Sequence, residues 1–459
     1  MLRIQDTARR AKVEFIPRTE GRVSMYVCGP TPYDVPHLGH GRTAVVFDTI
    51  RRYLTWSGFD VTYVTNITDV EDRIIARAAE RGTTESELAR TYEADYWQQM
   101  SRLNVEPPDD IPRATAFIGQ MQELIAELIA KGSAYVVEGQ GVYFQVDTFP
   151  EYGKLSHRTI DELRESAGAR VEVDERKRSP IDFALWKAAK PGEPQWDSPW
   201  GTGRPGWHIE CSAMSLEILG DGFDIHGGGT DLEFPHHENE IAQAEAAGHA
   251  FAHYWLHSAM VNVDGEKMSK SLGNFTTLED VLDEFDPRAF RLLVLQTHYH
   301  RQMELGDKEL ADADKAVERV DALMRRVRRA ELPAAELVDT SVFRDAMDDD
   351  FDTPAALAFI FELVRDANIA LDAGHTEDAA RLAATVRELW SALGLTWLDD
   401  DEELDAEISA LVTRRDEARE RKDWAEADRL RDELRAQGIV LEDTTGGTVW
   451  RRLRPDDEG

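Results

Sequence analysis

Two clusters of histidines and lysines, far apart in the sequence, could handle a phosphate group. The first is His37-Leu38-Gly39-His40, which follows a predicted strand and begins a predicted helix. Unpaired N–H groups at a helix N-terminus attract phosphate, and Gly39 leaves room for an adenine to approach the backbone. His37 and His40 can donate hydrogen bonds to an α-phosphate that gains charge under attack. Alone, such histidines are also typical of a surface or a core.

The second cluster is Lys267-Met268-Ser269-Lys270-Ser271, in a glycine-flanked loop after a predicted strand. Lys267 and Lys270 can close over a triphosphate and stabilise the departing pyrophosphate as point charges. An isolated loop of this kind is also typical of an exposed surface, but the two clusters together favour a site for ATP. We predict that their histidines and lysines act by charge stabilisation and not as general bases.

A glycine triplet offers a third candidate contact to the nucleotide. Gly227-Gly228-Gly229-Thr230-Asp231 is expected to form a turn between a strand and a helix. Glycines there permit close backbone approach, and Asp231 could hold a ribose hydroxyl. The predicted ATP-binding residues are therefore Gly39, His40, Gly229, Asp231 and Lys270.

The only two cysteines, Cys28 and Cys211, are candidate metal ligands. His236 and Glu240 are four residues apart, so on a helix they share one face and can hold one metal ion; His237 with Glu240 would also fit sterically. Two thiolates, an imidazole and a carboxylate suit Zn²⁺. The alternative for the cysteines is burial as small hydrophobic side chains, since two cysteines are too few for a disulfide framework.

These side chains need a parallel α/β sheet to position them. A strand over residues 23–27 precedes a helix from about 38 to 58, a strand over 60–67 and a helix over 69–81. A second block has a strand through 225, the glycine turn, a helix over 235–247 and a strand over 254–261. This alternation predicts a doubly wound, Rossmann-type nucleotide-binding domain. The two cysteines reach the same sheet edge only if both halves join.

Composition and periodicity divide the chain into five segments. We predict the first half of the sheet domain at 1–107, an insertion (a connective peptide) at 108–205, the second half with the lysine loop at 206–285, a helical bundle at 286–398 and a small C-terminal domain with a hairpin at 399–459.

The charge balance is strongly acidic, with 53 basic and 88 acidic residues and a net charge of -35. Such surfaces resemble those of halophilic proteins, in which salt screens self-repulsion. An acidic chain is a poor partner for nucleic acid except where arginines cluster, as at 325–329 and 451–454. The sequence shows neither a membrane-length apolar run nor a signal peptide. We therefore expect a cytoplasmic monomer without a membrane partner.

The motifs resemble those of the class I aminoacyl-tRNA synthetases and, within that class, of the cysteinyl-tRNA synthetase family. Besides the two phosphate motifs, the resemblance covers residues 26–34, 66–69, 207–214, 234–240, 438–443 and 450–452. Leu38 replaces the isoleucine common in the first motif, which is an apolar exchange. The resemblance implies that the helical bundle binds tRNA and that the last domain binds the anticodon.

The resemblance also implies one zinc ion per subunit that binds the substrate's sulfur. Its ligands would be Cys28, Cys211, His236 and Glu240, which selects His236 over His237. The substrate pocket would include Gly29, Thr68 and Trp207. Serine cannot offer a thiolate to the metal, so selectivity would reside in one contact and no editing site is expected.

The implied reaction joins L-cysteine and Mg²⁺-ATP into cysteinyl-adenylate, and the terminal ribose of tRNA(Cys) then takes the cysteinyl group. One alternative is a ligase of the mycothiol pathway that passes cysteine to an amino-sugar, but such enzymes lack the tRNA-reading domain that residues 438–452 resemble. A catalytically silent zinc-binding or RNA-binding paralogue is the other alternative, and the intact motifs argue against it.

Overall fold

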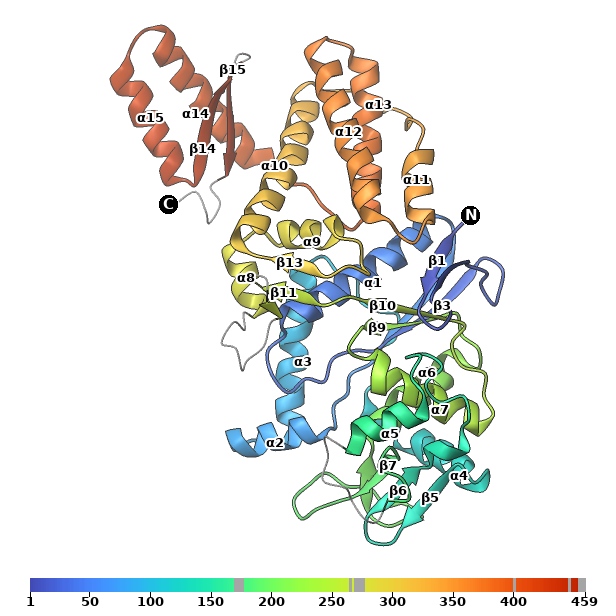
Figure 1. The fold of residues 1–459 in the computed structure, drawn as a ribbon. Helices are drawn as coiled ribbons and strands as arrows, with labels where there is room; N and C mark the ends of the chain where they lie inside the picture. Colours follow the sequence, from blue (N-terminus) through green and yellow to red (C-terminus); the bar gives the residue numbers. More distant parts are fainter. Residues whose placement is uncertain (169–176, 264–265, 268–276, 399–401, 445–446, 453–459) are drawn as a thin grey trace.

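The computed structural model describes residues 1–168, 177–263, 266–267, 277–398, 402–444 and 447–452 (Figure 1). Its centre is a four-stranded parallel sheet in the order β10-β9-β3-β4. The strands are β3 (Arg22–Val27), β4 (Asp60–Thr65), β9 (Ile225–Gly229) and β10 (Tyr254–Ser258). Both halves of the predicted domain thus contribute to one sheet, and the predicted α/β class is confirmed.

Alternate side chains of β3 enter different hydrophobic cores, because successive residues of a strand point to opposite faces. Met25 and Val27 belong to the core that contains α1 (Leu38–Trp56) and α9 (Pro287–Gln296). Tyr26 belongs to a second core, built from α4 (Ile118–Ala130), α6 (Trp207–Leu219) and α7 (Glu238–Ala247). The sheet is therefore covered on both faces, as parallel sheets usually are.

Residues 108–205 contain a separate antiparallel sheet. Its strands, in spatial order, are β5 (Ala134–Val137), β6 (Gly141–Phe144), β7 (Phe183–Ala188) and β8 (Gly203–Pro205). The short helices of this part are η1 (Ala114–Ala116), η2 (Val146–Thr148) and α5 (Ile160–Gly168). In Figure 1 this part lies at the opposite end of the molecule from the last helices.

Helices dominate the second half of the chain. Besides α7 and α9, the described ones are α8 (Leu278–Glu284), α10 (Asp307–Arg329), α11 (Ser341–Asp348), α12 (Thr353–Asp372), α13 (Thr376–Ala392), α14 (Glu402–Glu420) and α15 (Trp424–Ala436). The predicted terminal hairpin is confirmed as the antiparallel pair β14 (Ile439–Thr444) and β15 (Gly447–Arg452). Among the described residues, none of the helices combines the length and apolar character needed to cross a membrane.

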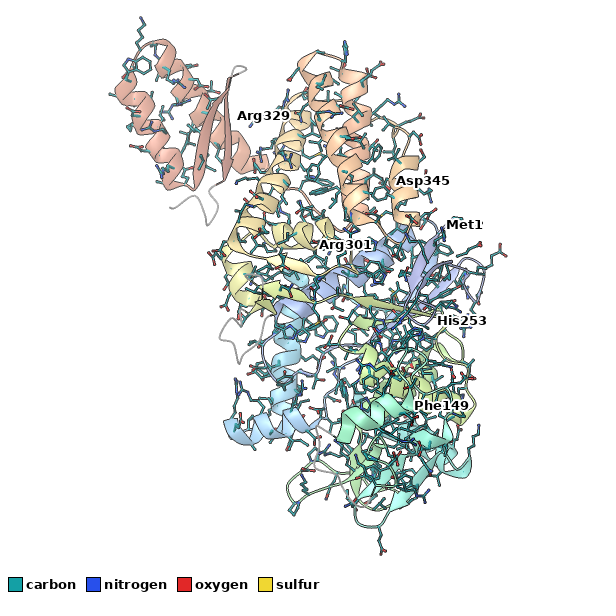
Figure 2. All side chains as sticks on the ribbon, in the orientation of Figure 1. Met1, Phe149, His253, Arg301, Arg329 and Asp345 are labelled. Atoms are coloured by element: carbon teal, nitrogen blue, oxygen red, sulfur yellow. The ribbon has the colours of Figure 1, made fainter. Side chains whose placement is uncertain are left out.

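Two elements near the start of the chain differ from the prediction. The hairpin of β1 (Arg3–Asp6) and β2 (Ala11–Glu14) was not predicted. It brings the Met1 amino group within 2.9 Å of Asp348 on α11. Figure 2 shows Met1 at the end of this helix, which also carries the labelled Asp345. The helix predicted from residue 69 is α2 (Asp72–Arg81), because the Glu71 carboxylate accepts the Arg73 N–H and caps it. It is followed by α3 (Glu85–Arg102).

The single strand predicted over residues 254–261 is wrong. The chain leaves the central sheet after β10, and β11 (Val261–Val263) pairs with β12 (Glu266–Lys267) and β13 (Met303–Leu305) in another sheet. The break has a cause in tertiary structure, because Arg42 of α1 donates to the Met260 carbonyl at 2.6 Å. That carbonyl no longer serves the ladder of the central sheet.

The turn predicted at the glycine triplet is also wrong, since Gly227, Gly228 and Gly229 continue strand β9. A Cβ at Gly227 would lie 2.3 Å from the Phe47 ring of α1. A Cβ at Gly228 would lie 2.9 Å from the His237 ring, in the turn η3 (Glu233–His237) that precedes α7. The glycines therefore allow close packing on the sheet and do not reverse the chain.

Candidate active site and metal centre

The first phosphate motif forms the N-terminus of α1. The His37 backbone N–H donates to Nδ1 of His40 at 3.1 Å, and the two rings stack with their centroids 3.8 Å apart. Because Nδ1 accepts, the proton of neutral His40 resides on Nε2. Burial lowers the pKa of His40 well below its ordinary value, and the neighbouring His37 adds to this effect. His40 can therefore offer an N–H donor at neutral pH without carrying a charge.

The end of the lysine loop lies beside this helix. Lys267 pairs through its backbone with Asn262, whereas Lys270 lies outside the described residues. After the loop, Thr277 bridges to His37, and the Leu278 N–H donates to the Pro36 carbonyl at 3.0 Å. The structure therefore brings the chain that leaves the second motif to the first motif, although the two are far apart in sequence.

Gly229 and Asp231 lie at the carboxyl edge of the sheet. The Thr230 N–H donates to the Ser258 carbonyl at 2.9 Å, which holds this turn against the end of β10. A Cβ at Gly229 would lie 2.4 Å from Oδ1 of the exposed Asp231, so the glycine leaves room for that carboxylate. Ligands of open parallel sheets bind at this edge, which suits the predicted ribose contact.

The candidate metal ligands come together from both halves of the sheet domain. One potential ligand atom from each of Cys28, Cys211, His236 and Glu240 lies within 4.8 Å of all the others. The Cys28 Sγ is 3.6 Å from the Cys211 Sγ and 3.6 Å from Oε1 of Glu240. Two thiolates bound to tetrahedral zinc at about 2.3 Å lie about 3.8 Å apart. The donor set and its spacing therefore fit Zn²⁺.

The surroundings favour His236 over His237 as the histidine of this centre. Nδ1 of His236 lies 2.9 Å from Nδ1 of His208, and its Nε2 lies 3.1 Å from Oε1 of Glu240. Nδ1 of His237 instead lies 2.8 Å from Nε2 of His257. A second possible group is Cys28, His226, His237 and Glu240, which contains one thiol in place of two. Soft thiolates favour zinc, so the group with both cysteines suits it better.

Burial makes the anionic forms of these ligands costly without a cation. It raises the pKa of Glu240, against the opposing effect of His226. A hydrogen bond with Cys28 lowers the pKa of Cys211, but burial and the nearby carboxylates of Glu240 and Glu210 together outweigh it, and the pKa is raised. A divalent cation inverts this balance, because a thiol that coordinates a metal is deprotonated.

The residues predicted to contact the substrate border this cluster through Asn66. The Gly29 N–H donates to Oδ1 of Asn66 at 2.9 Å, and Nδ2 of Asn66 donates to the buried Thr68 hydroxyl at 3.2 Å. The same Oδ1 lies 3.7 Å from the Cys211 Sγ. A Cβ at Gly29 would lie 1.7 Å from the Asn66 carbonyl oxygen, so only glycine fits. Trp207 stacks on His236, with ring centroids 4.2 Å apart.

Sequence reasoning missed two histidines of the site. His226 lies on β9 and its Nε2 is 2.8 Å from Oε2 of Glu240. His208 precedes Cys211 by three residues and contacts His236. The sequence indicated them only through their positions next to other candidate residues. The spacing between His226 and Glu240, and that between His208 and His236, is typical neither of one helix face nor of a metal-binding motif.

Three family models match successive parts of the chain. Residues 14–315 match the model described as the catalytic domain of tRNA synthetases class I (C). Residues 342–397 match the DALR domain, and residues 401–451 match the anticodon binding domain of cysteinyl-tRNA ligase. With the parallel sheet and the histidine motif at the start of α1, these matches define a class I aminoacyl-tRNA synthetase.

Solved structures of this class share the fold. Methionyl-tRNA synthetase of Mycobacterium tuberculosis, in complex with methionyl-adenylate, is 16% identical with a TM-score of 0.59 and covers 81% of this chain and 89% of its own. The LeuRS–tRNA–LeuAMS complex of Agrobacterium radiobacter is 13% identical with a TM-score of 0.58, over 84% of this chain and 87% of its own.

Relatives with high sequence identity over nearly the whole chain show the family to which it belongs. The cysteine–tRNA ligase of Chromobacterium violaceum is 51% identical over 98% of this chain and 100% of the relative, and that of Halorhodospira halophila is 52% identical over 99% and 100%. The chain belongs to the cysteine–tRNA ligase family.

Proposed function

We propose that the protein activates L-cysteine with Mg²⁺-ATP and transfers the cysteinyl group to tRNA(Cys), with one zinc ion selecting the substrate. The observation that supports this proposal most strongly is the cluster of Cys28, Cys211, His236 and Glu240. It lies at the same sheet edge as the histidine motif that begins α1. A bound zinc would supply a Lewis acid for the substrate's thiolate, which serine lacks. A cytoplasmic location and a monomeric state stay predictions.

The roles we propose for the chain's own residues follow from their places. His37 and His40 donate to the α-phosphate, and Lys267 and Lys270 hold the departing pyrophosphate. Gly39, Gly229 and Asp231 contact the adenosine, and Gly29, Thr68 and Trp207 enclose the amino acid. None of these roles requires a covalent intermediate, since the substrate carboxylate itself attacks ATP.

The DALR and anticodon-binding matches support tRNA as the acceptor. We assign tRNA binding to the helices from α10 to α13 and anticodon binding to the domain of α14, α15 and the hairpin. An amino-sugar acceptor, as in the mycothiol pathway, would leave these two parts without a role.

Amino-acid-dependent exchange of pyrophosphate into ATP, run with all twenty amino acids, tests the proposal. Each reaction is repeated with and without a zinc chelator, and at low and high salt. We expect exchange with cysteine only, lost on chelation and restored by zinc. Exchange with serine at a comparable rate, or no exchange with cysteine at any salt concentration, would overturn the assignment.

A further inference from the structure

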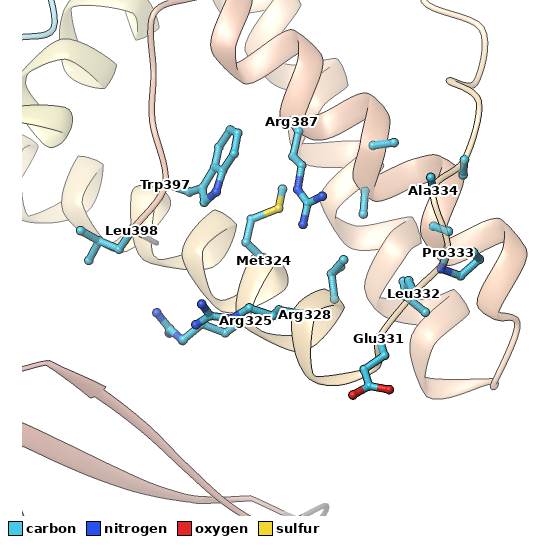
Figure 3. Close-up of a pocket in the computed structure, with 15 residues that line it drawn as sticks. Met324, Arg325, Arg328, Glu331, Leu332, Pro333, Ala334, Arg387, Trp397 and Leu398 are labelled. Carbon is cyan, nitrogen blue, oxygen red and sulfur yellow. The ribbon is translucent and has the colours of Figure 1, made fainter. Parts of the chain in front are cut away.

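A cleft of about 310 Å³ opens on the helical bundle, and none of the four candidate metal ligands lines it (Figure 3). It lies between the last turns of α10, the segment that follows α10, and α13. Figure 3 shows the side chain of Arg387, on α13, extending toward Met324 of α10. Trp397 and Leu398 close the cleft on the side where the chain leads on to α14.

The lining is basic although the whole chain is acidic. Among the described residues of the lining, Arg325, Arg328 and Arg387 stand against one carboxylate, that of Glu331. Arg325 also pairs with Glu318, so part of its charge is balanced outside the lining. Nε of Arg387 is buried and has no hydrogen-bond partner among the described residues. An unsatisfied guanidinium donor of this kind favours an anion, and phosphate matches its planar geometry.

The same cleft offers an aromatic surface. The guanidinium carbon of Arg387 lies 5.9 Å from the Trp397 ring centroid, so the cation and the indole face a common space. Leu332 and Pro333 add apolar lining. Stacking on an aromatic side chain combined with a phosphate held by arginine is how proteins bind single-stranded nucleotides. The chemistry therefore fits a nucleoside phosphate better than a free inorganic anion.

The position of the cleft in the chain favours a nucleotide that is part of an RNA over a free mononucleotide. Leu398 lies three residues before the stretch 401–451 that matches an anticodon binding domain, and α13 lies within the DALR match. We propose that the cleft receives one unstacked nucleotide of the tRNA, with its phosphate on Arg325, Arg328 and Arg387 and its base on Trp397. This inference rests on the proposed function, because tRNA is the acceptor in that function.

The test compares Arg387→Ala, Arg387→Lys and Trp397→Ala with the unchanged full-length chain. Loss of one charge-assisted contact should weaken tRNA affinity, and raise the KM for tRNA, about tenfold in Arg387→Ala. The slope of log affinity against log salt concentration should fall by about 0.7, as for one phosphate contact to a single strand. Arg387→Lys should keep the salt slope, and Trp397→Ala should lose affinity without changing it.

Arg381→Ala is the matched control, because Arg381 is an exposed arginine on the same helix and does not line the cleft. Cysteine-dependent pyrophosphate exchange should be unchanged in every variant, which also shows that each one folds. An unchanged KM for tRNA together with an unchanged salt slope in Arg387→Ala would overturn the inference.

Equilibrium dialysis with uridine 5′-monophosphate is the second experiment. Binding at micromolar concentration that depends on Arg387, together with normal tRNA affinity in Arg387→Ala, would assign the cleft to a free nucleotide instead. Absence of exchange in the unchanged chain would refute the proposed function separately.

Discussion

Glu240 uses its two carboxylate oxygens for different contacts. Oε1 faces Cys28 and His236, whereas Oε2 lies 2.8 Å from Nε2 of His226. The His226 ring stacks on Trp255, with centroids 4.5 Å apart and planes at 17°, so its orientation is fixed by packing. His226 therefore holds the carboxylate in the rotation that presents Oε1 to the other candidate ligands, as hydrogen-bond partners of metal ligands commonly do.

His226→Phe keeps the ring stacked on Trp255 and removes the nitrogen that contacts Glu240. We expect zinc affinity to fall about tenfold to hundredfold, because the carboxylate loses its orienting partner. Competition with a chromophoric chelator measures the affinity directly. His253→Ala, at an exposed histidine just before β10, is the control and should bind zinc normally. Equal zinc affinity in His226→Phe and the unchanged chain would show that packing alone orients Glu240.

The spacing of residues could predict the residue types of the candidate metal centre, but it left the choice between the adjacent histidines open, and only the family resemblance selected His236. The spacing of His236 and Glu240 places them on one helical face, and the structure confirms that they meet. The choice depends on His208 and His257, which reach the two rings from α6 and β10. Such contacts depend on how distant elements pack, and no local spacing encodes them.

At the scale of elements, α9 is fixed to its neighbours by one buried arginine. Arg291 donates to the Leu393 and Leu103 carbonyls, each at 3.0 Å, and pairs with Asp48 of α1. It thereby joins α9 to α1 and to the residues directly after the C-terminal ends of α3 and α13. A Cβ at Gly394 would lie 2.0 Å from Nη2 of Arg291, so the chain needs glycine there.

Arg291→Met should lower the free energy of unfolding by about 3 kcal/mol, because it leaves the buried Asp48 and two carbonyls without this donor. The loss stays at the low end of such effects since Arg52 still pairs with Asp48 at 2.8 Å. Denaturant titration measures it. The double variant with Asp48→Asn should recover part of the loss, and the exposed Arg365→Met should change stability by less than about 0.5 kcal/mol. A small effect in Arg291→Met would show that hydrophobic packing alone fixes α9.

The loop between α11 and α12 connects the bundle to the N-terminal hairpin through Asp350. Its carboxylate accepts the Gln5 N–H and the Tyr299 hydroxyl, each at 2.7 Å. Its own N–H donates to the Arg3 carbonyl, and its φ of 70° is left-handed. Burial raises the pKa of Asp350 to about 6, against these hydrogen bonds.

This pKa predicts a pH dependence of stability. The native carboxyl binds its proton more tightly than the unfolded one, whose pKa is about 3.9. Its contribution is therefore complete below about pH 4 and is lost as pH rises through about 6. Relative to Asp350→Asn, which does not titrate, the unchanged chain should lose about 3 kcal/mol of unfolding free energy between these limits. Parallel urea titrations of the two chains from about pH 4 to about pH 7 measure the difference in unfolding free energy. If the unfolding free energy changed with pH in the same way in both chains, the raised pKa of Asp350 would be contradicted. His298 and His300 also face this carboxylate, at 3.6 Å and 3.5 Å, and are the same in both chains.

The elements with clear periodicity could be predicted, and the failures have physical causes. Alternating strands and the apolar face of α1 are encoded locally. The break between β10 and β11 is not, because Ala259-Met260 carries no turn residue and the break depends on Arg42. The glycine triplet misled the prediction because glycine also occurs where a ring packs on a strand, as Phe47 does on Gly227.

At the scale of the molecule, the net charge of -35 is the dominant electrostatic feature. Like charges repel over about 10 Å in dilute salt and over about 3 Å at about 1 M salt. We therefore expect both the melting temperature and cysteine-dependent exchange to rise from about 0.1 M to about 2 M KCl. Thermal scans and exchange assays at several KCl concentrations test this. Equal stability in dilute buffer would refute the predicted halophilic adaptation and leave the enzymatic assignment untouched.

Because both halves of the shared sheet supply the candidate metal ligands, the proposed zinc site can form only late in synthesis. Cys28 follows β3, whereas Cys211, His236 and Glu240 follow only after the separate antiparallel sheet has been made. A nascent chain that has not emerged past residue 240 carries at most part of the ligand set. Because a metal site forms with the fold that joins its ligands, zinc uptake would report that both halves of the domain have found each other.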